Sequence, residues 1–538
     1  MSLPITLNYW LLALLPIVVL MLLMVKFRWG AAEAAPVGVI IALVSGVVFY
    51  KAPWDLIALE SAKGIWNGIA VLTVVLPAIL IYEVTNEAKA FEPFRKGMQK
   101  FSPNELLQIL AIGWVFVSFL QGVTGFGVPV AVGAPLLVGI GVTPLWAVII
   151  SLYGQAWANT FGTLAVAWDA LILQTGISDP ALIKATALWA SGFNWLINIA
   201  AGILICYFYG GRKGLKTGLP AVLIISLIHG GGQMLFSQAN PTLANFVMAC
   251  IALAVVFLLG KTSWYNKPYQ EPDSMIMDRK GREVDWDEKV DKEMSLHQAF
   301  IPYYALTFIT LFVLLIKPVE NALSFLKIGF AFPETLTAFG HVNKAVQLYS
   351  PITVFTHSGT FLLIAALIGY FSFKKMGAIA TGGGRRIFLS TMEKVMPAAI
   401  ATIGLIVMSK IMDGTGQTVV LAYGTANATQ AIYPVIAPFI GVLGSFMTSS
   451  NMSSNILFGS FQDTMSSLLG LDRAAILGAQ TGGGAIGSVI APGKVLLGTT
   501  TTGILGLEGE VMRKILPPTL LITGLSGVFL LVFHLIFR

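Results

Sequence analysis

The sequence predicts an all-α polytopic membrane protein with twelve to sixteen hydrophobic segments, arranged as two inverted repeats with broken helices or re-entrant hairpins. Three observations lead to this class. Of the 538 residues, 56% are hydrophobic and 11% are charged, less than half of the roughly 25% charge typical of soluble domains. Apolar runs long enough to cross a bilayer recur along the whole chain. A polar, glycine-rich break at 121–129 also has a counterpart at 445–455 in the second half.

The charge pattern excludes some partners. The net charge of +7 does not indicate nucleic acid, because Lys and Arg stand in short clusters between apolar runs, where they orient membrane helices. Cys206 and Cys250 lie inside apolar runs and predict neither a disulfide framework nor a metal site. We therefore expect a multi-pass protein of the cell (inner or plasma) membrane, surrounded by lipid. Its oligomeric state stays open.

Residues 1–260 form the predicted first membrane half. Its apolar runs precede and follow a charged connector at 83–105, and the polar break at 121–129 divides two of them. The runs lie near 9–25, 35–50, 65–82, 106–121, 126–142, 145–168, 187–209, 219–235 and 243–260. A hydrophilic stretch, 261–298, then separates the halves, and we predict that it is a solvated cytoplasmic loop.

Residues 299–538 form the predicted second half. A longer connector at 317–350 and a basic one at 372–394 separate its first runs, and the second polar break lies at 445–455. The runs lie near 299–316, 352–371, 395–412, 431–447, 455–469, 474–491 and 516–537.

The positive-inside rule gives the two halves opposite orientations. If the basic connectors are all cytoplasmic, the run 106–121 crosses from inside to outside, whereas 431–447 crosses from outside to inside. Gln155–Leu164 also aligns with Gln480–Val489, pairing Gln with Gln and Gly162 with Gly487. Inverted repeats with broken helices are a recurring build of secondary transporters, whose two halves expose one site to each side in turn.

The breaks are the predicted substrate site. Non-helical backbone at membrane depth must line a cavity or be buried against protein. Helices that begin at a break present free N–H groups and a positive dipole end, which suit a carboxylate. The alternative is that the glycines are packing notches and that Ser and Thr bond their own helix. The candidate substrate-binding residues are Gln121, Gly122, Thr124, Gly125, Phe126, Gly127, Gln155, Asn159, Thr448, Ser449, Ser450, Asn451, Asn455, Gln480, Ser488 and Lys494.

Ionisable residues within apolar runs are functional candidates because a charge is costly there. Asp169 and Lys494 end long runs at equivalent places in the two halves, so they could form a gate, or Lys494 could attract the anion. The alternative is that both reach toward the membrane interface. Asp169, Glu83, Asp463 and His357 are the candidates for a proton-coupling group.

The first break also carries a family resemblance. Gln121-Gly-Val-Thr-Gly-Phe-Gly-Val-Pro-Val130 resembles the Gly-x-x-Gly-Phe-Gly-x-Pro-Val signature of the bacterial L-lactate permease family. Later motifs of that family are similar to the stretches at 448–458, 483–487 and 490–492. The resemblance implies a proton-coupled importer of L-lactate and related 2-hydroxymonocarboxylates such as glycolate. It also implies re-entrant hairpins, elevator-like movement and no cofactor.

The chain departs from the family pattern at three places. Gln121 and Asn451 stand where the family often has Glu and Asp, and Ser488 stands where relatives tend to have Lys. An amide cannot exchange a proton, so if those acids couple transport in relatives, this chain must use another group or another ion. The chain is similar to a divergent member of the family.

Three other functions remain open or are set aside. A sodium-coupled transporter of another small organic anion would use the hydroxyl and carbonyl oxygens of the breaks, and a passive channel or exporter would share the composition. An enzyme is not expected, because the five His are scattered, with no His-Glu-x-x-His motif and no paired cysteines. The stretch 487–494 superficially resembles a phosphate loop but has one residue too many.

Overall fold

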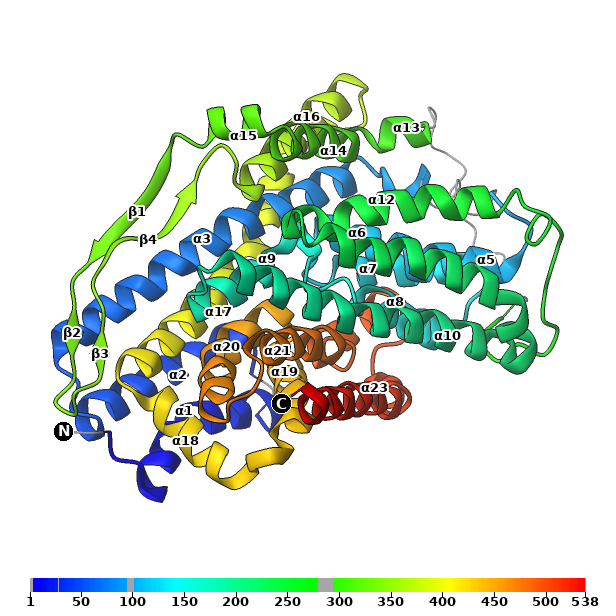
Figure 1. Ribbon diagram of the computed structural model, residues 1–538. Helices are drawn as coiled ribbons and strands as arrows, with labels where there is room; N and C mark the ends of the chain where they lie inside the picture. The colour runs from blue at the N-terminus through cyan, green and yellow to red at the C-terminus, as the bar shows by residue number, and fades with distance from the viewer. Residues whose placement is uncertain (1–2, 28, 94–100, 279–293, 538) are drawn as a thin grey trace.

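The computed structural model describes residues 3–27, 29–93, 101–278 and 294–537 (Figure 1). Within these ranges, 10 helices are long and apolar enough to cross a membrane, or 11 if the pair Ile301–Leu315 and Lys317–Leu323, bent by 92°, is one span. Two shorter apolar helices, Val128–Gly139 and Pro144–Ala156, accompany them. The predicted class, a helical polytopic membrane protein, is confirmed. The inverted relation of its halves stays a prediction.

The first half consists of helices joined by short connections. Prolines occupy the first helical turn of α8, α10 and α12, where their fixed φ favours helix initiation. The elements are α1 (Leu7–Val25), α2 (Ala31–Val44), η1 (Ser45–Phe49), α3 (Trp54–Glu87), α5 (Glu105–Leu110), η2 (Ala111–Phe116), α6 (Val117–Val123), α7 (Val128–Gly139), α8 (Pro144–Ala156), α9 (Gly162–Thr175), α10 (Pro180–Ser226), η3 (Leu227–Gly231), α11 (Gly232–Phe236) and α12 (Pro241–Leu259).

The second half combines helices with a small β element. Its helices are α13 (Leu296–Ala299), α14 (Ile301–Leu315), α15 (Lys317–Leu323), α16 (Ser358–Lys375), α17 (Gly383–Gly414), α18 (Gln417–Thr429), η4 (Gln430–Ile432), α19 (Tyr433–Thr448), α20 (Asn451–Leu468), α21 (Arg473–Gly487), α22 (Pro492–Thr501) and α23 (Glu508–Phe537). Its strands are β1 (Lys327–Phe332), β2 (Thr335–Leu336), β3 (Val342–Asn343) and β4 (Val346–Thr353).

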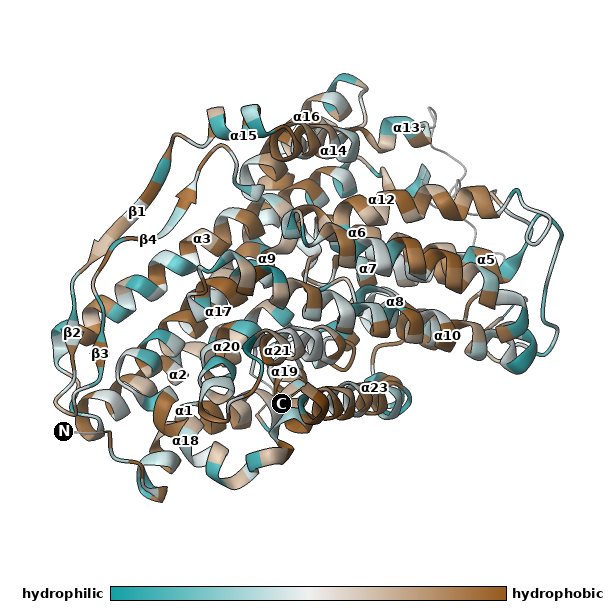
Figure 2. Cartoon of the chain, viewed as in Figure 1, coloured by the Kyte–Doolittle hydropathy of each residue, from teal (hydrophilic) through white to brown (hydrophobic). Residues whose placement is uncertain are grey.

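The helices form two groups. In Figure 1, α1, α2, α3, α17 and α18 lie together on one side, and α5, α8, α10 and α12 lie on the other. α17 packs along both α3 and α2, while α9, α20 and α21 lie between the groups. Apolar residues dominate the long helices, and polar residues gather in the connections, such as the one beyond α12 (Figure 2). This distribution fits helices surrounded by lipid tails.

The predicted connector at 317–350 is not irregular. It contains α15 and most of an antiparallel ribbon, in which β1 pairs with β4 and β2 pairs with β3. The ribbon is fixed to α3 by Trp66, whose Nε1 donates to the carbonyl oxygens of Tyr349 and Ser350 at 3.2 and 3.1 Å. The Phe330 ring meets the Trp66 ring edge-on at 4.8 Å. The ribbon is therefore a docked structural element along the edge of the helices (Figure 1).

The predicted hydrophilic loop is described in part, because 279–293 lies outside the described residues. Its first part packs on helix ends: Ser102 Oγ donates to the Tyr265 carbonyl at 2.8 Å, and the Tyr265 hydroxyl donates to the Thr217 carbonyl at 3.0 Å. The same hydroxyl accepts from the Ala221 N–H at 3.0 Å. Burial raises the pKa of Tyr265 to about 12, so this anchor stays protonated at neutral pH.

Glycines bring α19 and α21 into backbone contact. A Cβ on Gly441 would overlap the Gln480 carbonyl oxygen, and one on Gly487 would lie 2.6 Å from the Val442 Cα. Such close approach is typical of small-residue interfaces between membrane helices. The two helices are therefore held together directly, with no side chain between their backbones at these points.

Candidate functional site

Each half contains two helix pairs separated by a short break, in the same order. In the first half the breaks lie at 124–127, between α6 and α7, and at 157–161, between α8 and α9. In the second half they lie at 449–450, between α19 and α20, and at 488–491, between α21 and α22. Both predicted polar breaks thus interrupt helices, and a second pair of breaks accompanies them.

Left-handed backbone occurs at the first and third breaks and directly after the second, where Thr163, Leu164 and Ala165 have φ of 50°, 50° and 68°. Gly125, Phe126 and Gly127 have φ of 60°, 49° and 89°, and Ser449 has φ of 59°. Non-glycine residues rarely adopt this region, and functional sites are enriched in such strained positions. The backbone at these breaks therefore turns the chain, so that α7 and α20 do not continue the axes of α6 and α19.

Lys494 is the central charge of the site. It lies in the first turn of α22 and is 5% exposed, while the neighbouring Gly493 is not covered by protein. Its Nζ donates to Gln155 Oε1 and Asn159 Oδ1, both at 3.3 Å. Within the described part of the chain it forms no ion pair with a carboxylate. A buried cation that contacts only neutral dipoles is incompletely compensated, so an anion would stabilise it.

Asn159 joins the second and fourth breaks. Its Nδ2 donates to Ser488 Oγ at 2.9 Å and to the carbonyl oxygens of Gln155 and Ala156 at 3.1 and 2.8 Å. Its Oδ1 accepts from Lys494. The amide orientation is thereby fixed, with its oxygen turned to the cation.

Asn451 extends the site to the third break. Its Nδ2 lies 3.4 Å from Thr160 Oγ1 and 3.3 Å from Thr481 Oγ1, and these two hydroxyls are 3.2 Å apart. Asn455 Nδ2 donates to the same Thr481 hydroxyl at 2.9 Å. Because Thr160 follows Asn159 in the chain, the Asn451 cluster adjoins the Lys494 cluster.

Several polar atoms at these breaks have no hydrogen-bond partner among the described residues. They are Gln155 Nε2, Gln121 Oε1, Asn451 Oδ1 and Asn455 Oδ1. Buried polar groups are normally satisfied, and an orphan costs about 1–3 kcal/mol. Such a concentration of free donors and acceptors beside a buried cation points to a bound polar molecule or water.

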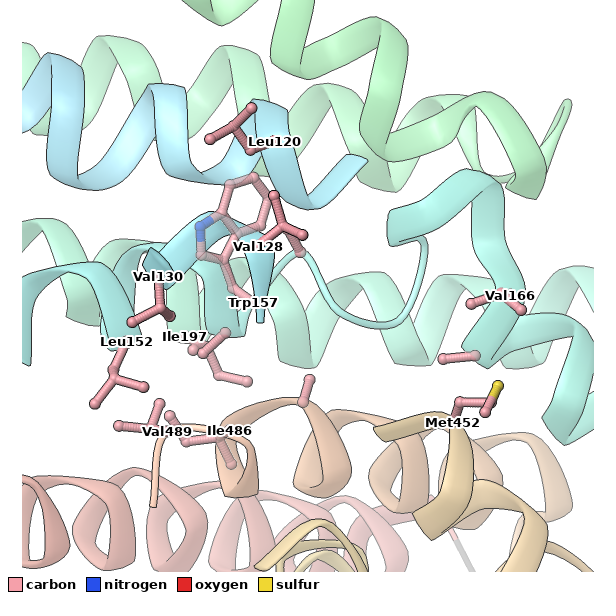
Figure 3. Packing of buried hydrophobic residues seen from close by; sticks show 14 of the residues in the cluster. Leu120, Val128, Val130, Leu152, Trp157, Val166, Ile197, Met452, Ile486 and Val489 are labelled. Atoms are coloured by element: carbon pink, nitrogen blue, oxygen red, sulfur yellow. The ribbon is translucent and has the colours of Figure 1, made fainter. Parts of the chain in front are cut away.

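Apolar side chains surround Trp157, which belongs to the second break. Figure 3 shows Trp157 among buried hydrophobic residues, with Leu120 above it and Ile197 and Ile486 below. Trp157 is fully buried. The polar cluster is therefore set in a low-dielectric surrounding, where its interactions with a charge are stronger than in water.

Other predicted residues have structural roles. The hydroxyls of Thr124 and Thr448 donate to the Leu120 and Gly444 carbonyls of their own helices, at 2.9 and 2.8 Å. Ser450 caps α20 by accepting from the Ser453 N–H at 3.3 Å. These three side chains therefore bond the backbone of their own helices, as in the alternative to a binding role.

The remaining predicted residues lie around the breaks. Ser449 Oγ accepts from the Gly493 N–H at 3.1 Å, joining the third and fourth breaks. Gln480 contacts Gln462 and Ser454 at 3.0 and 3.1 Å, deeper between α20 and α21. Gly122 packs on α12 beside Asn245, whereas Gln121 lies against Gly125 and Gly162.

The four predicted proton-coupling residues are dispersed. Glu83 is ion-paired with Lys394, and Asp463 with Arg473. His357 caps α16 by accepting from the Gly359 N–H at 3.3 Å. Asp169 lies in α9 without an ion-pair partner in the described ranges, and no ion pair between it and Lys494 occurs there. The suggested Asp169–Lys494 gate is therefore not formed in this state.

Sequence reasoning missed Thr160 and Thr481. Each follows a predicted residue directly, Asn159 and Gln480, and each donates or accepts through a hydroxyl within the Asn451 cluster. The sequence indicates them only through their position next to Asn159 and Gln480, which lie in the aligned stretches of the two halves. A lone threonine in a membrane helix is otherwise ordinary.

Known proteins are similar to this chain over nearly its whole length. The sequence model of the L-lactate permease family matches residues 9–537. Glycolate permease GlcA of Escherichia coli (strain K12) is 27% identical over 97% of this chain and 95% of that protein. L-lactate permease of Salmonella typhi is 26% identical, with 97% and 95% of the two chains covered, and that of Bacillus subtilis (strain 168) is 25% identical, with 92% and 91% covered.

A solved structure also aligns with the chain. The Alcanivorax borkumensis YdaH transporter covers 87% of this chain and 86% of its own, at 13% identity and a TM-score of 0.42, which is too low to support an argument about the site. The family match, in contrast, spans nearly the whole sequence. The chain therefore belongs to the L-lactate permease family, as a multi-pass membrane permease and not an enzyme.

Proposed function

We propose that this protein is a secondary active transporter that imports L-lactate or a related short 2-hydroxymonocarboxylate such as glycolate, by proton symport with alternating access. The observation that carries the proposal is the buried Lys494 ammonium, which lacks a carboxylate partner in the described chain and lies where the helix breaks meet. The names of the relatives, glycolate permease and L-lactate permease, support the substrate class.

The free groups match the chemistry of a 2-hydroxycarboxylate. Lys494 Nζ and the unpartnered Gln155 Nε2 are donors for a carboxylate. The unpartnered Asn451 Oδ1 is an acceptor for a hydroxyl. A charge-assisted hydrogen bond is roughly twice as strong as a neutral one, so the carboxylate would set affinity, and the hydroxyl would set the preference over acetate.

The coupling ion follows from a different argument. Gln121 and Asn451 are amides and cannot carry a proton, so proton symport requires an acid elsewhere in the chain. Sodium is the alternative coupling ion, because the free amide oxygens of Asn451 and Asn455 are suitable ligands for it. No resident cofactor is required by either scheme.

The test is uptake of labelled L-lactate into proteoliposomes under an inward proton gradient, with and without sodium, against unlabelled glycolate, pyruvate and acetate. We expect accumulation that a protonophore abolishes and that glycolate inhibits more strongly than acetate. Accumulation that depends on sodium would mean that sodium, and not the proton, is the coupling ion. Equilibration without accumulation would identify a passive pathway, and no uptake of lactate or glycolate would reject the substrate class.

Gly484→Ala should impair transport by displacing a site residue. A Cβ at Gly484 would overlap Asn451 Oδ1, and overpacking of this kind costs about 1–3 kcal/mol. We expect the half-saturating lactate concentration to rise about tenfold or more, since about 1.4 kcal/mol is one decade.

Gly192→Ala is the matched control, because a Cβ there meets nothing within 4 Å. Its half-saturating concentration should equal that of the wild type. Equal transport by both variants would remove Asn451 from the substrate site.

A further inference from the structure

A second buried polar cluster lies at the end of α17, beyond the breaks. The Asp413 carboxylate accepts hydrogen bonds from three uncharged donors: Gln174 Nε2 at 2.9 Å, Ser460 Oγ at 2.8 Å and Thr418 Oγ1 at 2.6 Å. Lys410 Nζ lies 4.0 Å from the same carboxylate. These donors belong to α9, α20 and α18, so one carboxyl group joins four helices.

Other charged and titratable groups face this cluster from α3 and the β ribbon. Glu60 and Lys63 of α3 form a buried ion pair at 2.7 Å, close enough to interact electrostatically with Lys410 and Asp413. His341 Nε2 lies 3.0 Å from the Asp413 backbone carbonyl, and Tyr349 contacts Lys410. The two acids, Glu60 and Asp413, balance the two lysines, so the ionised cluster has no net charge while His341 is neutral.

Two of the three donors sit on helices that begin in the substrate site. α9 follows the break that holds Asn159, and Gln174 lies near its other end. α20 begins with Asn451, and Ser460 lies nine residues along it, a distance of about 13 Å at the helical rise. Asn455 Nδ2 donates to the Ala167 carbonyl at 2.9 Å, which ties α20 to α9. A displacement of these helices at the site therefore reaches Asp413.

On the other side of the cluster, α17 is joined to α9 through Gln174, whose Nε2 donates to Ser409 Oγ at 2.6 Å and whose carbonyl accepts from Lys410 Nζ at 3.4 Å. Asp413 and Lys410 belong to α17, which packs along α3 and α2, and the ribbon is fixed to α3 by Trp66. If α9 and α20 shift relative to α17, Asp413 loses the donors Gln174 and Ser460. A buried carboxylate that loses hydrogen bonds to its charged form binds a proton more readily.

We propose that Asp413 is the binding site of the coupling proton. The proton comes from water on the side of higher proton concentration, binds the Asp413 carboxylate when α9 and α20 have moved, and leaves to water on the other side when Gln174 and Ser460 return. Linkage requires that the substrate and the proton alter each other's affinity by the same factor. This inference rests on the proposed function. It names an acid that can carry the proton, which the amides Gln121 and Asn451 cannot do.

The decisive variant is Asp413→Asn, assayed in proteoliposomes by two measurements. For one proton per lactate, a gradient of one pH unit sustains about a tenfold accumulation ratio. We expect this ratio to fall to unity in the variant, because an amide cannot exchange a proton. Exchange of external labelled lactate for internal unlabelled lactate should continue within about twofold of the wild type, because exchange needs no net proton movement.

Asp273→Asn is the matched control. Asp273 is exposed in the connector after α12, and its variant should retain both accumulation and exchange. Undiminished gradient-driven accumulation by Asp413→Asn would overturn the proposal. Wild-type protein that takes up lactate without any response to a proton gradient would instead reject proton symport itself, before any variant is compared.

If Asp413→Asn misfolds and loses both accumulation and exchange, the Ser460→Ala variant tests the proposal instead. Removing one neutral donor should preserve the fold and move the pH of half-maximal uptake upward, because a carboxylate with fewer donors holds its proton more tightly. Ser467→Ala, a change of an exposed serine on the same helix, should leave the pH profile unchanged. An unshifted profile in Ser460→Ala would also overturn the proposal.

Discussion

Replacing Lys494 with Gln should reduce the efficiency of L-lactate uptake, the maximal rate divided by the half-saturating concentration, about 100-fold. This is the largest effect that we expect from one substitution. Loss of one partner in a buried, hydrogen-bonded charge pair costs about 2–5 kcal/mol, and about 1.4 kcal/mol corresponds to one decade. The melting temperature of the protein should not fall, because the ammonium is buried without a carboxylate partner in the described chain and its removal relieves a desolvation cost. Initial uptake rates and thermal unfolding in detergent check the two parts.

Lys374→Gln is the control for this substitution. Lys374 is exposed in the last turn of α16, where it lies over the Tyr370 ring. Its variant should transport lactate as the wild type does. Equal effects of the two substitutions would mean that Lys494 contributes only general surface charge, as the interfacial alternative supposes.

Gln155→Glu should reduce L-lactate uptake at least about tenfold, by the opposite route. Gln155 Oε1 already accepts from Lys494, and its Nε2 has no partner among the described residues. A glutamate therefore keeps the hydrogen bond from Lys494 and places its own carboxylate against the ammonium that would otherwise bind the substrate. The protein should be as stable as the wild type or more stable, because the buried cation gains a counter-charge.

Two controls separate competition from damage in the Gln155→Glu variant. Gln347→Glu makes the same chemical change at an exposed position of β4 and should leave uptake intact. The double variant Gln155→Glu with Lys494→Gln should be no worse than the more affected single variant, since residues of one network are not additive. A double variant that loses the product of both effects would show that the two side chains act separately.

The membrane class and the two polar breaks could be read from the sequence, because each depends on local composition, whereas the role of Lys494 stays a prediction. Thr448 to Asn455 holds seven polar residues in eight, and the structure places a helix end and a helix start there. The bonds of Lys494 to Gln155 and Asn159 could not be predicted, because they join residues more than 330 positions apart. Only the packing of α8, α9 and α22 brings these residues together.

The Asp413 cluster shows the same limit more sharply. Its members are drawn from α3, α9, α17, α18 and α20, and only the packing of these helices brings them together. The ribbon was missed for another reason. Buried and exposed residues alternate only weakly in its strands, because burial is set by docking on Trp66 and not by a core of the ribbon's own. The sequence of the strands is therefore similar to that of an irregular connector.

The backbone contact between α19 and α21 bears on selectivity. Gly441 and Gly487 hold the two helices against each other, and the breaks that carry Ser449 and Ser488 follow directly from their ends. A binding site framed by touching backbones has little freedom to lose when a ligand binds, so less of the interaction energy is spent on ordering. It also has little room to adapt, because a larger ligand would have to part helices instead of turning a side chain. We expect a sharp cutoff in substrate length, with two- and three-carbon hydroxyacids accepted and longer ones excluded by shape.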